Sequence, residues 1–557
     1  MDTQEKMEFT SFRWLALNLN LLLGLNLMFV KNVVPLLGLK TGGDMLYPIG
    51  IQNFEDLRKG GYVYVDKTAL IHHLVSTGKY YFLSRPRRFG KSLLVSTMEA
   101  YFRGRRDLFA GLAIEALEKD WTDYPVLHLD LSGKKYDNPK ALADVLNYHI
   151  KTWESFYGSG NAPDIETRFK QVIDNAYEKT HRQVVILVDE YDKPIVDNLG
   201  NSELVDYYKS TLQGFYSVMK AKDGNIRFGF LTGVSKIGKL SVFSGLNNLN
   251  DISMDAEYSD ICGISERDLH ECFDGSISEL ADANSLSLED CYKRLKDMYD
   301  GYHFSEDTAG VYNPFSLLNT FRSKKFKEYW FETGTPTMLV KVMKQTSFDI
   351  TTLSDNVVVS SATLSGMQDI VNRPVPLFFQ TGYLTIKGYD SEYKEYRLGF
   401  PNDEVKNGFL NFIYSYYVPV NPAEDNTRVS RLSKALRAGR PEEFMRDLES
   451  LFANTSYQIQ GDSEKNFQYA IYIIMELLGE YVEAERSTSN GRIDLLLQTS
   501  DYIYVIELKI DNTAEAALQQ IEEKGYAKPF VNDPRKLFKI GVSFSTANRR
   551  IEDWVVV

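Results

Sequence analysis

Two segments constrain the fold of this chain more than any others, because each joins a short apolar run to residues suited to phosphate chemistry. The first, YYFLSRPRRFGKSLLVSTMEAYF (80–102), has the pattern of a buried strand, a loop ending in Gly-Lys-Ser and an amphipathic helix. The second, VVILVDE (184–190), has the pattern of a strand that ends in two acidic residues. A loop between a strand and a helix directs backbone N–H groups at phosphate oxygens. The two segments together therefore predict an α/β fold with a phosphate-binding loop.

The residues at these two strand ends match the needs of a nucleoside triphosphate bound with Mg²⁺. Lys91 would reach the β- and γ-phosphates, while the Ser92 hydroxyl and the Asp189 carboxylate would hold Mg²⁺. Glu190 would orient and deprotonate an attacking water. Three further loop residues are predicted to bind the phosphates: Arg87, Arg88 and Gly90. We therefore expect ATP and Mg²⁺ as ligands of this region.

The loop departs from the GxxxxGK[ST] pattern at its start, because Arg85 stands where the first glycine is expected. Two other interpretations stay open: a chance GKS tripeptide beside a basic surface loop, and a strand whose Asp-Glu end is only a charged cap. The order of the two segments, with the lysine loop first, favours the nucleotide site. A further strand ends near Thr232 and Ser235, which suit either a γ-phosphate sensor or ordinary strand-end polar groups.

The apolar pattern divides the chain into parts, as its length of 557 residues requires. In the N-terminal module (45–264), four apolar runs alternate with helix-length segments, which predicts a parallel sheet with helices on both faces. These runs lie at 80–84, 125–132, 184–190 and 227–233. The middle region (265–440) is predicted to be mainly helical, with short strands at 382–390 and 396–400.

The C-terminal module (441–557) is predicted to begin with helices and to continue as a second α/β domain. Its expected elements after Gly479 are strands at 493–498 and 502–510, a helix at 514–525 and a last strand at 537–545. Asp494 opens the first of these strands, and Glu507 and Lys509 lie two apart on the second, hence on one face. If the two strands form a hairpin, the carboxylates can hold Mg²⁺ or Mn²⁺ beside the lysine. A surface salt bridge on a hairpin is the plainer alternative.

The composition sets the expected location and limits the expected partners. The net charge of −13 gives no overall attraction to nucleic acid, so such contacts would need local basic patches. Three cysteines without disulfide-framework or metal-site spacing indicate reduced thiols and a cytoplasmic protein. The basic run 103–106 suits a solvated helix end or, alternatively, a phosphate-backbone contact. The adjacent pair His72-His73 is expected to have a structural or surface role.

The first 44 residues contain an almost wholly apolar stretch, WLALNLNLLLGLNLMFV (14–30). It is near the lower length limit for a spanning helix and is weakened by asparagines, and no small-residue cleavage site follows it. Three interpretations stay open: translation that starts at Met45, which would make this leader spurious or disordered, a membrane anchor, and a folded extension. We expect no stable membrane association.

A family resemblance extends over about residues 45–557. The motifs PIGIQNFEDLRKGGYVYVDKT, RPRRFGKSL, VVILVDEYDKPI and FLTGVSKI, followed by YDGYHF, YNPFSLL, YWFETGTP, FQTGYLTI and LGFPNDEV, resemble AAA-ATPase-like proteins of gut and anaerobic bacteria. The resemblance implies that Arg85 is a family trait and that the chain ends in a PD-(D/E)xK nuclease domain. It also implies that Glu485 is a helix-borne metal ligand, with Glu483 and Glu476 as weaker candidates, and that Gln520 and Tyr526 form a downstream motif.

The expected function is that of an ATPase coupled to a metal-dependent nuclease-like domain that acts on DNA or RNA. An alternative is an ATP-switched regulatory protein whose nuclease fold binds without cutting. A third is a motor that works as a homo-oligomeric ring, in which an arginine from one copy serves the next; Arg227 and Arg267 are candidates.

Overall fold

The computed structural model describes residues 45–557 apart from a set of internal gaps. These gaps are 161, 247, 333–338, 340–341, 344–352, 354–356, 366–373, 418–426, 454–471, 475, 480–482, 487–494, 546 and 549. The predicted leader (1–44) and Asp494 therefore lie outside the described residues. None of the helices in the described part combines the length and the apolar character that crossing a membrane requires.

The N-terminal module has the predicted parallel sheet. Its strands are β1 (Tyr80–Ser84), β2 (Val126–Asp130), β3 (Val184–Asp189), β4 (Ile226–Gly233) and the short β5 (Asn250–Asp251). They pair in parallel in the order β2-β3-β4-β1-β5. Each of the four predicted apolar runs forms one strand, because buried parallel strands carry continuous apolar sequence.

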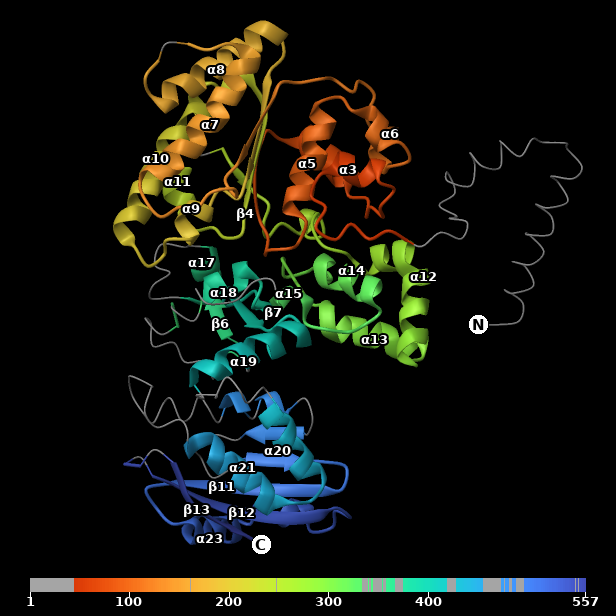
Figure 1. The fold of residues 1–557 in the computed structure, drawn as a ribbon, viewed down its shortest axis with the longest axis vertical. Coiled ribbons are helices and arrows are strands. Elements are labelled where there is room, and N and C mark those ends of the chain that lie inside the picture. The colour runs from red at the N-terminus through yellow and green to blue at the C-terminus, as the bar shows by residue number, and fades with distance from the viewer. Residues whose placement is uncertain are drawn as a thin grey trace, which may run out of the picture.

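Helices cover both faces of this sheet (Figure 1). On one side lie α7 (Lys140–Tyr157), α8 (Ile165–Thr180), α9 (Lys193–Val196), α10 (Ser202–Ala221) and α11 (Lys239–Val242). On the other side lie α3 (Phe54–Lys59), α5 (Lys91–Phe102) and α6 (Ala113–Leu117), with α4 (Thr68–Thr77) packed against α6. The loop after β1 and the acids after β3 meet at the same edge, with the end of β4 between them.

The middle region has two parts. The helices α12 (Glu266–Asn284), α13 (Leu288–Tyr299) and α14 (Pro314–Ser323) share a buried cluster, against which the N-terminal arm packs through Met45 and Tyr47. The second part contains α15 (Tyr329–Glu332), β6 (Val357–Ser360), α17 (Ser361–Ser365), α18 (Val375–Thr381), β7 (Thr385–Asp390), β8 (Glu395–Gly399) and α19 (Asp403–Tyr417). Its antiparallel strands follow the order β6-β8-β7. The strand expected from 382 begins at 385, because Gly382 ends α18 in the left-handed region, with φ 89°.

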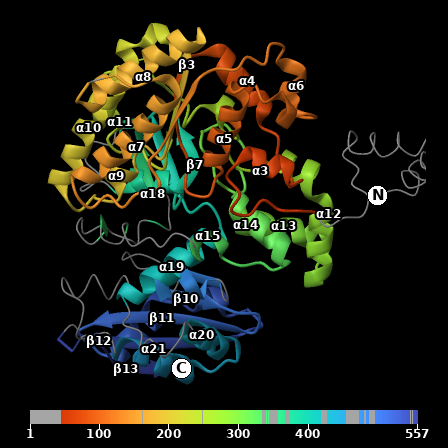
Figure 2. The same cartoon turned by 45° about the horizontal axis from the view of Figure 1, so that its top comes forward.

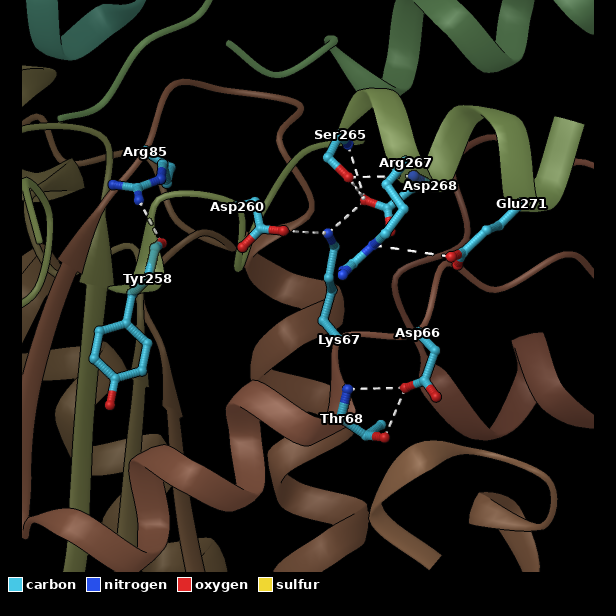
Figure 3. Close-up of polar contacts among 10 residues, drawn as sticks. All are labelled: Asp66, Lys67, Thr68, Arg85, Tyr258, Asp260, Ser265, Arg267, Asp268 and Glu271. Carbon is cyan, nitrogen blue, oxygen red and sulfur yellow. Dashed lines mark hydrogen bonds and ion pairs between the residues drawn. The ribbon is translucent and has the colours of Figure 1, made fainter. Parts of the chain in front are cut away.

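A buried ion pair joins the start of α4 to the start of α12 (Figure 3). The Lys67 ammonium lies 2.6 Å from Asp268 Oδ2 and 3.3 Å from Asp260 Oδ2. Asp268 also completes the capping box of α12 with Ser265. Neighbouring Asp66 accepts the backbone N–H of Thr68 at 2.8 Å, which fixes the first turn of α4. Lys67 of the YVDKT motif therefore joins the N-terminal module to the middle region, while Asp66 stabilises the start of α4.

The C-terminal module is built on a second sheet, in the order β13-β12-β11-β10-β9. Its elements are α21 (Pro441–Ala453), β9 (Glu483–Arg486), β10 (Leu495–Gln498), β11 (Tyr502–Ile510), α23 (Ala514–Lys524), β12 (Lys536–Ser545) and β13 (Arg550–Val556). The helix α20 (Thr427–Arg437) precedes the predicted boundary and packs against α21. The strand expected to be last, β12, is followed by another, β13. Its sequence RIEDWVV mixes charged and apolar residues, as an edge strand allows, so it lacks the apolar run of a buried strand.

The middle region lies between the two modules in Figure 1, and in the turned view of Figure 2 its α18 and β7 overlap the N-terminal module. One continuous cluster of buried residues runs from β1 through α18 and α19 to β11 and β12. The ion pair Lys406–Glu476, at 2.7 Å, adds a polar link between α19 and the described helical turns before β9. The predicted fold class is confirmed: a parallel α/β sheet with helices on both faces, a mainly helical middle and a C-terminal α/β domain.

Candidate functional site

The loop after β1 has the backbone of an anion site. It enters α5 through Gly90, whose φ of 89° is left-handed and which caps the helix without a side-chain hydrogen bond. The first N–H groups of this 12-residue helix therefore point into the loop without an intrahelical acceptor. Arg88 also has a positive φ, of 67°, so the loop turns sharply twice before α5. This arrangement fits a bound phosphate.

Lys91 lies in the centre of this loop. Its ammonium donates to the carbonyl oxygens of Arg85 and Pro86, both at 3.0 Å, and its side chain is buried. Burial lowers the pKa of Lys91, although the nearby Asp189 and Glu190 carboxylates oppose that shift. The described contacts of Lys91 are therefore with loop carbonyls, in the position from which a phosphate oxygen can exchange for them.

Arg85 has a structural position, away from the inside of the loop. Its guanidinium donates to three carbonyl oxygens, those of Ser84 at 3.0 Å, Ser253 at 2.7 Å and Tyr258 at 3.0 Å. It also lies 4.0 Å from the centroid of the Phe304 ring in the middle region. Because the backbone of Arg85 avoids the left-handed region, glycine is not required there. The departure from the loop pattern is thus accommodated.

The acidic side of the site follows β3. Asp189 is buried and accepts the N–H of Glu190 at 3.0 Å. Glu190 has a φ of 53°, which turns the chain sharply after the strand. Burial raises the pKa of the Glu190 carboxyl above its usual range. The charge of Lys91 lowers this pKa, but its effect is smaller than that of burial.

Sequence reasoning missed Asp192, which ties the end of β3 to the end of β4. Its buried carboxylate accepts N–H bonds from Val234 at 3.1 Å and Ser235 at 2.7 Å, and the Ser235 hydroxyl at 2.6 Å. The signal was present as a third acid in VDEYD, but nothing in that pattern indicates what it binds. Of the two predicted sensor residues, Ser235 is thus engaged by Asp192 and Thr232 is wholly buried.

These segments open onto one cleft of about 510 Å³. Its lining includes the arm at 48–52, the loop residues Arg87, Arg88, Gly90, Lys91 and Ser92, and Glu190, Asp192 and Lys193 after β3. The middle region contributes the opposite wall, with Phe315, Leu318, Trp330, Thr381 and Tyr383. The sequence did not predict this wall, since apolar residues do not reveal which cleft they face.

The middle region also approaches the loop backbone closely. Trp330 Nε1 donates to the carbonyl of Arg87 at 3.0 Å. The Phe89 ring packs against Tyr302, with centroids 4.7 Å apart. A Cβ added to Gly382 would lie 2.7 Å from Cβ of Pro86, so glycine permits this approach.

Several predicted candidates lie outside this cleft. Arg227 donates to the carbonyl of Val75 at 3.2 Å, and Arg267 lies exposed beside Glu271. His73 contacts Glu257 at the surface. The arginines of the run 103–106 pair with acids in their own module: Arg103 with Glu99, Arg105 with Glu55 and Asp107, and Arg106 with Glu115. This run therefore has the contacts of a solvated helix end.

A second cluster lies on one face of the C-terminal sheet, where β11 meets α23. The ammonium of Lys509 lies 3.3 Å from Glu507 Oε1 and 2.5 Å from Gln520 Oε1. Gln520 Nε2 contacts the same Glu507 oxygen and lies 3.4 Å from the Tyr526 hydroxyl. The carboxylate and amide oxygens fit a hard cation such as Mg²⁺, and the neighbouring ammonium fits a phosphate. The structure thus brings together four of the residues selected from the sequence.

The remaining metal candidates are less complete. The ladder between β10 and β11 is antiparallel, as predicted, and its first described pair is Leu495 with Ile506, next in sequence to Asp494 and Glu507. Glu485 lies on β9, opposite Leu496, so its predicted helical position is wrong. The segment EAER has helix-forming residues, but pairing with β10 overrides that local preference. Nowhere in the described part of the chain do three His, Cys, Asp or Glu side chains converge in a metal-ligand group.

Together, the fold and the cleft define a P-loop NTPase-like module joined to a nuclease-like one. The family described as "Predicted AAA-ATPase" matches residues 48–243, and the PD-(D/E)XK nuclease superfamily matches residues 462–554. An uncharacterized protein in the vnfD 5′ region of Azotobacter chroococcum mcd 1 is 35% identical over 525 residues, which cover 91% of this chain and 98% of that protein. The chain therefore belongs to the AAA-ATPase-like family and carries a C-terminal PD-(D/E)XK nuclease superfamily domain.

Proposed function

We propose that this chain is a cytoplasmic bacterial ATPase whose nucleotide cycle controls a metal-dependent nuclease-like domain acting on nucleic acid. The observation that carries the proposal is the convergence of Lys91, Ser92 and Glu190 on one cleft. Bound Mg²⁺ would neutralise phosphate charge, with Ser92 and Asp189 as its protein ligands. Lys91 would bind the phosphates, and Glu190 would accept the proton of the attacking water. The continuous core between the modules supports coupling between them.

The ATPase half is tested with Lys91→Ala and Glu190→Gln. We expect Lys91→Ala to abolish ATP binding, because the loop loses the cation that contacts the phosphates. Glu190→Gln should bind ATP but lower kcat by about 10²- to 10⁴-fold, the usual contribution of a general base. Lys434→Ala, at an exposed position on α20, is the control and should match the wild type. Hydrolysis at the wild-type rate in Glu190→Gln would rule out this role.

The nuclease half is tested with labelled DNA and RNA, with and without ATP, in Mg²⁺ or Mn²⁺. Glu507→Gln and Lys509→Ala should abolish cleavage and leave ATP binding unchanged. Glu522→Gln is the matched control, since Glu522 lies on α23 but is exposed and pairs with Lys539. Cleavage that persists in Glu507→Gln would remove the nuclease assignment.

A second candidate function is an ATP-switched interaction protein whose nuclease fold binds nucleic acid without cutting it. It is favoured by one observation: both Lys509 and Gln520 contact Glu507 Oε1, one of the two carboxylate oxygens that could bind a metal. ATP-dependent binding of DNA or RNA with no cleavage in either metal would select this function.

A further inference from the structure

Arg88 is a loop residue whose side chain contacts the middle region inside the cleft. Its guanidinium lies 4.8 Å from the centroid of the Phe315 ring, at the start of α14. Both side chains line the nucleotide cleft, together with Lys91 and Glu190. The left-handed backbone of Arg88, with φ 67°, is unfavourable for a residue with a side chain. The surrounding contacts therefore hold Arg88 in a conformation that the isolated loop would disfavour.

Phe315 is itself held by a buried polar network. Asn313 Oδ1 accepts the N–H groups of Phe315 at 2.9 Å and Ser316 at 3.1 Å, which fixes the first turn of α14. Glu404 Oε1 accepts the Ser316 hydroxyl at 2.9 Å and the N–H of Trp330 at 2.8 Å. Asn313, Ser316 and Glu404 are all wholly buried. This network gives Phe315 a fixed position above the loop.

The neighbours of Arg88 are anchored on the same part of the molecule. The carbonyl oxygen of Arg87 accepts a hydrogen bond from Trp330 Nε1. The backbone N–H of Trp330 in turn donates to Glu404 Oε1. Phe89 is buried against Tyr302 and Phe304 of the middle region. The middle region of the same chain thus fixes the loop on both sides of Arg88.

The other arginines considered for catalysis do not face the cleft. Arg227 and Arg267 have the contacts given above, and neither is among the residues that line it. The Arg85 guanidinium is buried under Phe304 and directed at carbonyl oxygens. The arginines that line the cleft are Arg87 and Arg88, and the guanidinium of Arg88 lies over the Phe315 ring.

We propose that Arg88 stabilises the charge on the γ-phosphate during ATP hydrolysis, and that Phe315 positions it within the same chain. This inference rests on the proposed ATPase function. The water oxygen bonds to the γ-phosphorus while the bond from that phosphorus to the β–γ bridging oxygen breaks, and its electron pair stays on ADP. The water proton passes to Glu190 and then to the released phosphate. A guanidinium donates to two phosphate oxygens at once, which suits it to this charge. A neighbouring copy is then not needed for the chemical step.

The phosphate-contacting role is tested by kcat and nucleotide affinity in the full chain. Arg88→Ala should lower kcat by about 10³-fold or more, while its affinity for ATP changes by less than about tenfold. Arg88→Lys should recover only a small part of the lost kcat, since a lysine ammonium cannot donate to two phosphate oxygens in the bidentate geometry of a guanidinium. The matched control is Arg294→Ala, which removes another arginine stacked on an aromatic ring, Phe326, at 4.4 Å in the middle region. Wild-type kcat in Arg88→Ala would overturn the proposal.

The positioning role of Phe315 is tested with two variants that change its side chain in different ways. Phe315→Leu keeps the apolar volume but removes the aromatic face, so kcat should fall by about tenfold. Phe315→Tyr keeps the ring and should retain the wild-type rate. Equal kcat in the leucine and tyrosine variants would show that Phe315 only packs, and would overturn this part.

A mixing experiment separates action within one chain from action between copies. Arg88→Ala can bind ATP but lacks the arginine, and Lys91→Ala retains the arginine but cannot bind ATP. If a neighbouring copy supplied Arg88, the mixture would recover activity. We expect the mixture to stay as inactive as its components, and recovery would overturn the proposal.

Wild-type protein that hydrolyses no ATP would refute the proposed function and this inference together, whereas loss of rate in Lys91→Ala but not in Arg88→Ala would refute the inference alone.

Discussion

Arg85 stands where a glycine is expected, and its side chain explains why the loop tolerates it. The guanidinium bonds to three carbonyl oxygens and stacks on Phe304, so it joins the end of β1 to two other segments. Comparison with the loop pattern marks this position only as a departure, because a pattern records what most loops need. The structure shows instead a buried cross-link that glycine could not form.

Restoring the glycine should therefore harm the protein. We expect Arg85→Gly to lower the free energy of unfolding by about 3 kcal/mol or more, since it leaves buried carbonyls without donors and creates a cavity. Arg88→Gly is the control: it loses one exposed stacking contact but relieves a left-handed backbone, so stability should change by less than about 1 kcal/mol. Denaturant unfolding measures both. A more stable Arg85→Gly variant would contradict the account of this residue.

The raised pKa of Glu190 predicts a pH dependence. Burial favours the protonated carboxyl, so the base form that accepts a proton from water is lost at a higher pH than for an ordinary carboxyl. The rate at saturating ATP should fall with decreasing pH through this raised pKa. The free energy of unfolding depends on pH in the opposite direction to the rate. The protonated carboxyl favours the folded state at low pH, and this contribution is lost as pH rises through the folded pKa. Glu190→Gln should thus be at least as stable as the wild type at neutral pH, by thermal unfolding.

At the scale of single residues, strand-end chemistry was predictable and contacts between distant segments were not. Lys91, Ser92 and Glu190 line one cleft, a grouping that follows from their local spacing from apolar strands, and their roles remain predictions. Phe315 is far from the loop in sequence, and nothing near it indicates a basic side chain as its neighbour. A local pattern cannot show that a wall of the cleft comes from the middle region.

Among the elements, the buried strands were predicted well and the edge strands poorly. The runs that form β1, β3 and β11 are continuous and apolar because neighbours cover both faces. β9 and β13 lie at the edges of their sheet, where charged residues are common and the apolar signal is weak. The helical position of Glu485 was implied by the family resemblance, and its pairing with β10 contradicts that position.

The contact between α4 and α12 gives an element-scale prediction. Lys67→Met should destabilise the protein by about 3 kcal/mol, because the Asp268 carboxylate stays buried without its cation. Lys59→Met is the control, since Lys59 and Glu55 form an exposed pair, and its effect should be below about 0.5 kcal/mol. Denaturant unfolding distinguishes the two. Equal losses of unfolding free energy in Lys67→Met and Lys59→Met would show that the buried pair contributes no more to stability than the exposed pair.

The same pair predicts a response to acid. Burial opposes ionisation of Asp268, but Lys67 outweighs it and holds the pKa below the usual range. The pair therefore contributes stability above the unfolded pKa, about 3.9, and loses it as pH falls through the folded value. Lys67→Met should show a smaller loss of stability in that acid range than the wild type.

At the scale of the whole molecule, packing does not stop at the predicted boundary of 441. The helix α20 precedes that boundary, yet the carbonyl of Leu436 accepts the Tyr504 hydroxyl at 2.5 Å, and Leu432 lies in the shared core. The boundary remains a prediction. We expect a fragment 427–557 to unfold cooperatively and a fragment 441–557 to do so at a lower temperature or not at all. Equal melting temperatures by circular dichroism would show that α20 belongs with the middle region.

Calorimetric titration tests whether the cleft between the phosphate loop and the middle region binds ATP. Mg²⁺-ATP is titrated into the wild type, into Lys91→Ala and into the control Lys434→Ala, after equal unfolding profiles show that all three are folded. We expect one site per chain in the wild type and the control, and no measurable binding in Lys91→Ala. Binding to Lys91→Ala with wild-type affinity, or none to the wild type, would contradict this expectation.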